Sequence, residues 1–476
     1  MNRQIKYICL GIICMPSLFT ACKTPSIVEK TANTEVPESF GSSQDTVNSA
    51  TINWADYFSD PYMIALIDTA LQNNQELNIT LQEIQISQNE ISARKGEYLP
   101  FVGIRGGLGV EKTARYTPLG ANEATTDIEP GREMPDPVPD FMLGAFANWE
   151  VDIWHKLRNA KKSAVMRYLA SVEGKNFMQT NIVAEIASSY YELLALDNEL
   201  EIVKRNIEIQ SNAFEIVKQQ KQAARVTELA VRRFEAQVLK TKGLQYSIQQ
   251  EITETENRIN YLLGRYPQPI KRSSESFVDF KPDSSFAGIP SQLLQNRPDI
   301  RQAELELSAA KLDVKVAKAR FYPSLDISAG VGLQAFNPAF FLKPESLLYS
   351  VAGDLAAPLI NRNAIKAAYK SANAQQIQAV YKYEQTILNA YIEVANQLAM
   401  ISNMNKSYEL KQQEVQALVR STDISNDLFS SARADYMEVL LTQREALESK
   451  FELVETKMKQ LQAKVGIYRS LGGGWQ

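Results

Sequence analysis

The stretch that decides the fold is ISARKGEYLPFVGIRGGLG, residues 91–109, because the chain repeats it as VKVAKARFYPSLDISAGVG, residues 314–332. Five positions recur in register, as Lys95, Pro100, Ile104, Gly107 and Gly109 in the first copy and Lys318, Pro323, Ile327, Gly330 and Gly332 in the second. Each copy predicts a helix that a proline ends and a glycine-bearing strand that follows it. A second match pairs residues 158–160 (RNA) with residues 362–364 (RNA). A repeat of about 200 residues is too long for a solenoid unit and indicates a duplicated domain.

The composition narrows the classes of function. The chain has 476 residues, a formal net charge of -4 and a single histidine, His155. Its length suggests two or three domains, and its charge gives no sign of nucleic-acid binding. The sequence contains no GxxxxGK[ST] phosphate loop, no HExxH and no recognisable arrangement of a nucleophile with its base. We therefore expect no enzyme activity, no metal and no cofactor.

The first residues predict export. Arg3 and Lys6 precede an apolar run over residues 7–19, which is too short to span a membrane as a mature helix. The run ends in residues 18–22 (LFTAC), which resemble a bacterial lipoprotein cleavage site. This predicts a signal peptide over 1–21, lipidation of Cys22 and an extended arm over 22–53; an ordinary signal peptide is the alternative. No aspartate follows Cys22, so sorting to the outer membrane is expected.

Long helices are predicted from a sustained period of seven residues. The first runs for roughly 65 residues beyond Trp154, or ~100 Å at the helical rise. Its repeating apolar residues are Ile186, Leu193, Leu200, Ile207 and Phe214. The second copy has the same seven-residue spacing at Ile387, Val394, Ile401, Tyr408 and Val415. Such a period favours left-handed supercoiling of neighbouring helices. On this feature alone, a coiled-coil rod or scaffold is an equal alternative.

Four segments predict strands, near residues 101–116, 141–153, 324–336 and 347–359. Apolar residues alternate with polar ones and glycines, most clearly over 325–334. This is the pattern of a membrane barrel, although a soluble sandwich with one wet face permits it too. The charged residues predicted on the lumen side are Arg105, Glu150, Asp152, Asp326 and Asp354. The intervening stretches 117–140 and 337–346 are predicted to be outward-facing loops.

Four strands cannot close a barrel, and open strand edges are not tolerated in hydrocarbon. If these strands span a membrane, several chains must share one barrel. A trimer would contribute about twelve strands, which is within the range of known barrels.

Four further stretches carry a resemblance to a known family. They are residues 149–158 (WEVDIWHKLR), 262–267 (LLGRYP), 290–300 (PSQLLQNRPDI) and 471–475 (LGGGW). In this order and spacing they resemble the TolC-like outer-membrane efflux family, lipoprotein (NodT/OprM-type) branch. His155 stands where the family usually has glycine. The local reading of Arg297-Pro298-Asp299 is a helix start, since proline and an acidic residue both suit a first turn.

The resemblance implies a mainly α-helical homotrimer with a shared 12-stranded β-barrel in outer-membrane lipid and a long coiled-coil α-barrel in the periplasm. It implies two TolC-like repeats, 54–264 and 290–476, joined by an equatorial linker, 265–289. Its partners would be a periplasmic adaptor (membrane fusion) protein and an inner-membrane transporter, expected to be proton-driven. The helix turns at 220–227 and 430–436 would be the periplasmic tips. The tip and gate residues would be Arg225, Thr227, Glu228, Arg433, Asp435 and Tyr436.

The predicted function is a passive exit channel of a tripartite efflux pump for small solutes or drugs. Two alternatives stay open at this point. One is a periplasmic coiled-coil scaffold, which the glycine-bearing strands disfavour. The other is an outer-membrane channel of a protein secretion system, which the lipoprotein start and the ending at residues 471–475 disfavour.

Overall fold

The computed structural model describes residues 24–40, 48–129, 131–273, 277, 287–431 and 433–475. The predicted signal peptide, Cys22 and Ala432 lie outside these residues. The described chain divides into two compact units. The first holds the described part of 1–31 together with 85–169 and 305–380, and the second holds the remaining described residues. Each unit therefore takes segments from both sequence copies.

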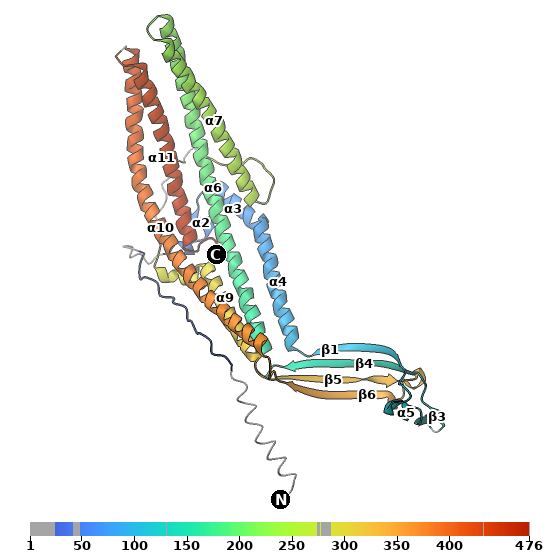
Figure 1. The fold of residues 1–476 in the computed structure, drawn as a ribbon. Helices are drawn as coiled ribbons and strands as arrows, with labels where there is room; N and C mark the ends of the chain where they lie inside the picture. Colours follow the sequence, from blue (N-terminus) through green and yellow to red (C-terminus); the bar gives the residue numbers. More distant parts are fainter. Residues whose placement is uncertain are drawn as a thin grey trace. The chain divides into compact units, whose positions relative to one another are not determined.

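The first unit contains one antiparallel sheet of four strands (Figure 1). Their order is β1-β4-β5-β6, with bounds β1 (Phe101–Glu111), β4 (Val138–Val151), β5 (Ser324–Ala335) and β6 (Leu347–Ala356). The four predicted strands are confirmed, although β1 and β6 end earlier than expected and β4 begins earlier. The strands β1 and β6 are the two edges of the sheet within the chain.

The connection between β1 and β4 is more ordered than predicted. It contains the short helix α5 (Pro118–Glu123) and a small hairpin of β2 (Asp127–Glu129) with β3 (Arg132–Glu133). Thr117 begins α5, because its side chain accepts a hydrogen bond from the backbone N–H of Gly120. Two 3-10 turns, Pro338–Phe340 and Pro344–Ser346, connect β5 to β6.

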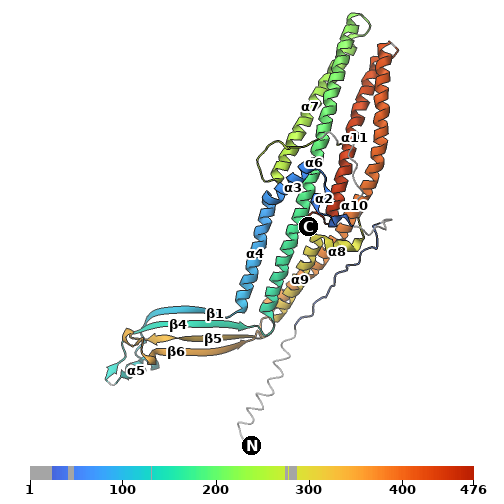
Figure 2. The same ribbon diagram turned by 180° about the vertical axis from the view of Figure 1, so that it is seen from behind.

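The repeated motif forms the structure that it predicts. The helices α4 (Gln75–Tyr98) and α9 (Pro298–Ala319) each end shortly before the proline that leads into β1 or β5. Proline ends a helix because it lacks the backbone N–H that the next turn would need. The strands β4 and β6 are each followed by a very long helix, α6 (Lys156–Gln222, 67 residues) or α10 (Asn363–Ser430, 68 residues) (Figure 2).

Each long helix turns back into a second helix of 35 residues, α7 (Glu228–Leu262) or α11 (Tyr436–Ser470). These turns coincide with the predicted tips. Both returning helices end on glycines with left-handed backbone conformations, Gly264 (φ 65°) and Gly472 (φ 88°). Glycine suits this position because it adopts positive φ without steric cost. The two hairpins therefore have matching ends.

The main core lies in the second unit. Its fully buried side chains come from α3 (Pro61–Asn73), α6, α7 and α11, and include Ile67, Ile186, Leu193, Ile259 and Leu461. Ile186 and Leu193 belong to the seven-residue pattern, so that pattern marks core positions. The short helices α2 (Trp54–Tyr57) and α8 (Leu293–Asn296) complete the described helices.

Candidate functional site

One face of the sheet is apolar across all four strands. The strand register aligns Ile104, Ala145, Val331 and Tyr349 in a single row across β1, β4, β5 and β6. Within the chain these side chains remain uncovered: Ile104 is 83% exposed and Tyr349 is 80% exposed. An uncovered apolar band of this kind matches the lipid-facing surface of a membrane barrel.

The opposite face is polar and carries a row of acids. Glu150, Asp326 and Asp354 stand directly opposite one another on β4, β5 and β6, at the end of the strands that leads into the helices. Lys156 pairs with Glu150, with Nζ 2.5 Å from Oε1. With three carboxylates and one paired lysine, this row carries a net negative charge. Like charges that face each other across strands repel. Arg105 lies on the same face, with its guanidinium 5.7 Å from the ring centroid of Phe146.

The prediction that Asp152 is a lumen-facing strand charge is wrong. The strand β4 ends at Val151, and the side chain of Asp152 is buried. Its carboxylate accepts hydrogen bonds from the backbone N–H groups of Leu157 (3.0 Å) and Arg158 (2.9 Å). It therefore caps the N-terminus of α6, where donors without an intrahelical partner and the helix dipole both favour a carboxylate.

The turn from β4 into α6 explains the usual glycine of the family at this place. His155 has φ 56°, in the left-handed region that costs a residue with a side chain roughly 1–2 kcal/mol. Neighbouring contacts hold the turn. The indole N–H of Trp154 donates to the carbonyl of Pro323 at 2.8 Å, and its ring stacks on Tyr322. The start of α6 is thereby tied to the start of β5.

In each copy, the arginine of the RNA sequence contacts an aromatic residue of the helix–proline–strand motif. Arg158, which lies in the first copy of residues 158–160, places its guanidinium 5.3 Å from the ring centroid of Tyr98. Arg362 does the same over Phe321 at 5.6 Å. Both aromatic residues lie two residues before the proline of the helix–proline–strand motif. The repeat therefore preserves a cation–π contact that holds each long helix against the helix before the strand.

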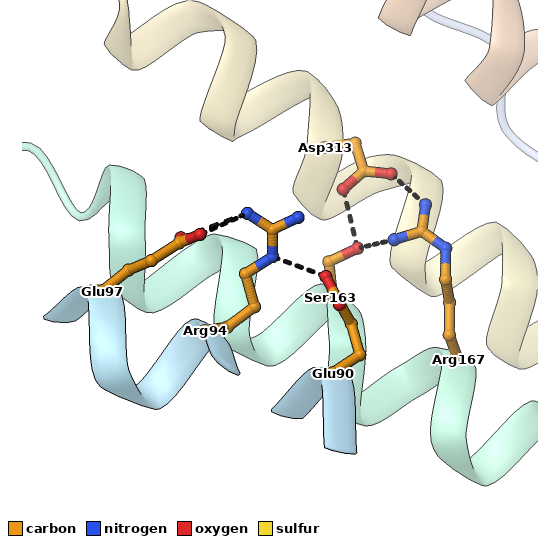
Figure 3. Close-up of polar contacts among 6 residues, drawn as sticks. All are labelled: Glu90, Arg94, Glu97, Ser163, Arg167 and Asp313. Atoms are coloured by element: carbon orange, nitrogen blue, oxygen red, sulfur yellow. Dashed lines mark hydrogen bonds and ion pairs between the residues drawn. The ribbon is translucent and has the colours of Figure 1, made fainter. Parts of the chain in front are cut away.

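A polar network around one buried hydroxyl joins α6 to α9 (Figure 3). The hydroxyl of Ser163, which is 1% exposed, donates to the carboxylate of Asp313 at 2.7 Å and accepts from Arg167 at 2.9 Å. Arg167 also pairs directly with Asp313. Arg94 binds only Glu90 and Glu97 of its own helix among the residues of Figure 3. The network holds α6 against α9.

Arg297 forms a deeply buried ionic centre in the second unit. Its guanidinium, in a residue 4% exposed, donates to both oxygens of Asp299 (2.9 and 2.6 Å), to Glu393 (2.6 Å) and to the carbonyl of Ser470 (2.9 Å). Burial lowers the pKa of Arg297, but the hydrogen bonds that it donates to Asp299 and the negative charges of Asp299 and Glu393 raise it by more, so the net pKa lies above the usual value. Pro298 begins α9 as predicted. The links to α10 and α11 were not foreseen.

The C-terminal motif packs against the same place. The indole N–H of Trp475 donates to the carbonyl of Asn296 at 3.3 Å. A Cβ atom on Gly472 would lie 2.6 Å from that same oxygen, so only glycine allows this approach. Two motifs that the resemblance placed far apart in the sequence therefore form one structural joint.

The predicted equatorial linker is anchored by Arg272. Its side chain donates to both carboxylate oxygens of Asp197 on α6 (2.6 and 2.9 Å) and to Glu256 on α7 (2.5 Å). Burial lowers the pKa of Arg272, whereas the bonds to these carboxylates raise it, and the net effect is a raised pKa. Near the same helices, burial raises the pKa of Glu199 to about 7, with help from the charges of Glu251 and Glu455.

The predicted tip residues lie at the two hairpin turns. Thr227 caps α7 by accepting from the backbone N–H of Ala230, and Asp435 occupies the cap position of α11 without a side-chain hydrogen bond. Glu228 pairs within the chain with Lys221 (2.5 Å) and Arg232 (2.8 Å), and the hydrogen bond from Lys221 is the main reason that its pKa is lowered.

The two tips pack together through a small apolar cluster. Its buried members are Val217, Ala230, Val231, Phe234 and Val439, and Tyr436 packs against them half-buried. In the described part of the chain, Arg225, Arg433 and Asp435 form no ion pair and are exposed. The role of these tip residues as a gate stays a prediction.

None of the helices in the described ranges combines the length and apolar composition that a membrane crossing requires.

The family profile described as "Outer membrane efflux protein" matches residues 66–265 and 289–473, which is most of the chain. The chain belongs to this family of outer-membrane efflux channels.

Individual relatives agree with this assignment. The chain is 28% identical over 424 residues to the pyoverdine export outer membrane protein OpmQ of Pseudomonas aeruginosa, covering 89% of this chain and 87% of that protein. It is 25% identical over 471 residues to the cation efflux system protein CusC of Escherichia coli O6:H1, covering 97% and 98%. The crystal structure of the open state of the Neisseria gonorrhoeae MtrE outer membrane channel shares the fold, with a TM-score of 0.82, 20% identity and 95% and 99% coverage.

These findings confirm the predicted family, the fold class and the role as an outer-membrane efflux channel. The protein is located in the outer membrane. The alternative of a periplasmic scaffold is set aside by the family match, and the relatives named above are efflux proteins rather than secretion channels.

Proposed function

We propose that three copies of the chain form one exit duct. The observation that carries this proposal is the sheet, which has an uncovered apolar face. The outer edges of β1 and β6 also have no partner strand in the described part of the chain. Unpaired backbone groups at such edges are costly in lipid. Because β1 and β6 run antiparallel to each other in the strand order, β6 of one copy can pair with β1 of the next. Three copies then close a barrel of about twelve strands.

The duct works as the outer-membrane part of a tripartite pump. Its partners are a periplasmic adaptor at the helical tips and an inner-membrane transporter that supplies the energy. Relatives are named for the export of pyoverdine, cations and solvents, which supports a duct that transmits different solutes while the transporter selects them. We propose that passage through this chain is passive and involves no catalysis, as its membership in a channel family supports.

The lumen is expected to prefer cations. Three copies of the row Glu150, Asp326 and Asp354 would line the duct with carboxylates, which raise the local cation concentration. In planar bilayers at low salt, the reversal potential of the wild-type channel should indicate cation preference. The triple variant Glu150→Gln, Asp326→Asn and Asp354→Asn should lose most of it, while Asp152→Asn, which alters a helix cap, should keep it. Anion preference of the wild type would refute the lumen assignment.

The gate is proposed to lie at the tips. The exposed residues Arg225, Arg433 and Asp435 have no ion-pair partner in the described part of the chain, so they are available to neighbouring copies, with Thr227, Glu228 and Tyr436 beside them. Exposed pairs contribute only ~0–1 kcal/mol each, so adaptor binding could open such a gate. The double variant Arg225→Ala with Asp435→Ala should increase single-channel conductance of the isolated trimer. Unchanged conductance would place the gate elsewhere.

Lipidation of Cys22 is proposed from the sequence and is compatible with the described arm. A few residues after Cys22, Ile27 packs against Phe321 and Tyr369, and the carbonyl of Lys30 accepts from Gln376. These contacts hold the arm against α9 and α10, close to the start of β5. Cys22→Ser should abolish fatty-acid labelling of the mature protein, and an unlabelled wild type would disprove the assignment.

We also propose that residues 54–264 and 290–476 are two copies of one repeat joined by the linker 265–289. The matching hairpin ends at Gly264 and Gly472 support this division, as do the two arginine–aromatic contacts.

A further inference from the structure

A groove of about 400 Å³ lies between α10 and α11, away from the tips. Its walls carry Glu414, Glu445, Glu448 and Glu452, and its remaining lining residues are Ala417, Leu418 and Ser449. Lys411 bridges Glu414 and Glu452. In the part of the chain that the structure describes, Glu445 and Glu448 have no ion-pair partner.

The floor of the groove contains a hydroxyl without a partner. Ser449 is 3% exposed, and its Oγ forms no hydrogen bond in the structure. A buried polar atom left without a partner costs free energy comparable to a lost hydrogen bond. Ionised glutamates only accept hydrogen bonds, so a group that binds in the groove must donate them. The negative charge of the groove favours a cation.

The first hairpin shows how the same position is satisfied elsewhere. Ser449 and Thr241 occupy the same place counted from the start of α11 and α7, and Leu418 and Gln210 match when counted back from the ends of α10 and α6. In the first hairpin, the hydroxyl of Thr241 donates to Gln210 Oε1 at 2.7 Å. In the second hairpin, leucine replaces that glutamine, so no side chain across the hairpin takes the hydrogen bond of Ser449.

The comparison of the two hairpins also indicates which surface contacts the groove. Leu447 of α11 is 7% exposed, whereas its counterpart on α7, Leu239, is 62% exposed. The residue after Leu239 is Lys240, which is exposed and lacks an ion pair in the described residues; its counterpart is Glu448. Leu244 and Ile248 of α7 share an apolar cluster with Phe451 of α11, so the two hairpins run side by side at the level of the groove.

We propose that α7 of a neighbouring copy completes the groove, with Leu239 against Leu418 and the Lys240 ammonium among Glu445, Glu448 and the Ser449 hydroxyl. Lysine supplies three donors and one positive charge, which are what the groove lacks. The contact rests on the trimer proposed above and assigns one of its interfaces. It explains an exposed leucine, an unpaired lysine and an unpartnered buried hydroxyl together.

Disulfide crosslinking in the full-length membrane-assembled protein tests the contact. The pair Lys240→Cys with Glu448→Cys should give covalent dimers and trimers on oxidation. Neither single variant should do so, and neither should the mismatched pair Lys240→Cys with Glu438→Cys, because Glu438 lies near the tip. Light scattering of the same samples in detergent reports the oligomeric state independently.

Charge exchange provides a second measurement. Glu448→Lys and Lys240→Glu should each lower the temperature at which the trimer dissociates, and combining them should restore it; Glu438→Lys should cause no shift. An intact trimer with neither crosslink nor restoration would overturn the inference while leaving the trimeric duct standing. If the trimer stays intact with neither crosslink nor restoration, and Glu445→Lys also abolishes crosslinking of the adaptor to the channel, the groove would be a binding site for the adaptor. That outcome would overturn the inference. A monomer would overturn both proposals.

Discussion

Replacing Arg297 by alanine is expected to lower the stability of the protein by roughly 3–5 kcal/mol, the usual cost of removing one partner from a buried ion pair. The guanidinium of Arg297 neutralises Asp299 and Glu393 and also binds the carbonyl of Ser470. Its removal leaves the side chain of Asp299, which is 17% exposed, without its counter-charge. The thermal unfolding transition of the purified protein, followed by circular dichroism, measures the loss.

Two matched variants separate charge from geometry. Arg297→Lys keeps the charge but cannot make the two parallel bonds to Asp299, so an intermediate loss is expected. Arg94→Ala removes an arginine whose side chain is 40% exposed and whose partners are surface glutamates, so its effect should stay within ~1 kcal/mol. If Arg297→Ala unfolded at the same temperature as Arg94→Ala, the joint between α9, α10 and α11 would not be a major source of stability.

Replacing Val331 by arginine is expected to prevent assembly in the membrane. Val331 lies in the middle of β5, on the apolar face, and is 53% exposed within the chain. An arginine on the lipid face of a barrel costs about 2–4 kcal/mol at the bilayer midplane, and a trimer would incur this cost three times. The amount of heat-stable trimer recovered from outer membranes should fall to a small fraction of the wild-type level.

The control is on the same strand. Ser328 points to the opposite, polar face, because successive side chains of a strand alternate between faces. Ser328→Arg should therefore assemble nearly as well as the wild type. Equal assembly of both variants would contradict the assignment of the apolar face to lipid, while failure of both would show that β5 accepts no added bulk.

Much of the fold could be predicted because its signals are local. Pro100 and Pro323 end helices for a reason contained in the residue itself, namely the missing backbone N–H. The seven-residue period identified buried positions such as Ile186 and Leu193, since a long helix pair must bury one stripe wherever it packs. The alternation over 325–334 identified the two faces of β5.

Predictions about single charged residues were less reliable. The alternation of β4 continues past its end, so Asp152 looked like a lumen charge, although the donors at the start of α6 recruit it as a cap. The alternation of the strand gives no sign of these backbone donors, which bind the carboxylate of Asp152.

The sequence by itself determined the order of helices and strands, because proline breaks, heptads and alternation act over a few neighbouring residues, and its short motifs indicated the family. Only the tertiary structure decided the ionic partners. Arg297 and Glu393 are 96 residues apart, and the hydroxyl of Thr241 finds Gln210 across its hairpin while that of Ser449 finds no partner. Such pairings depend on contacts within a few ångströms between packed helices, and spacing along the chain does not encode those distances.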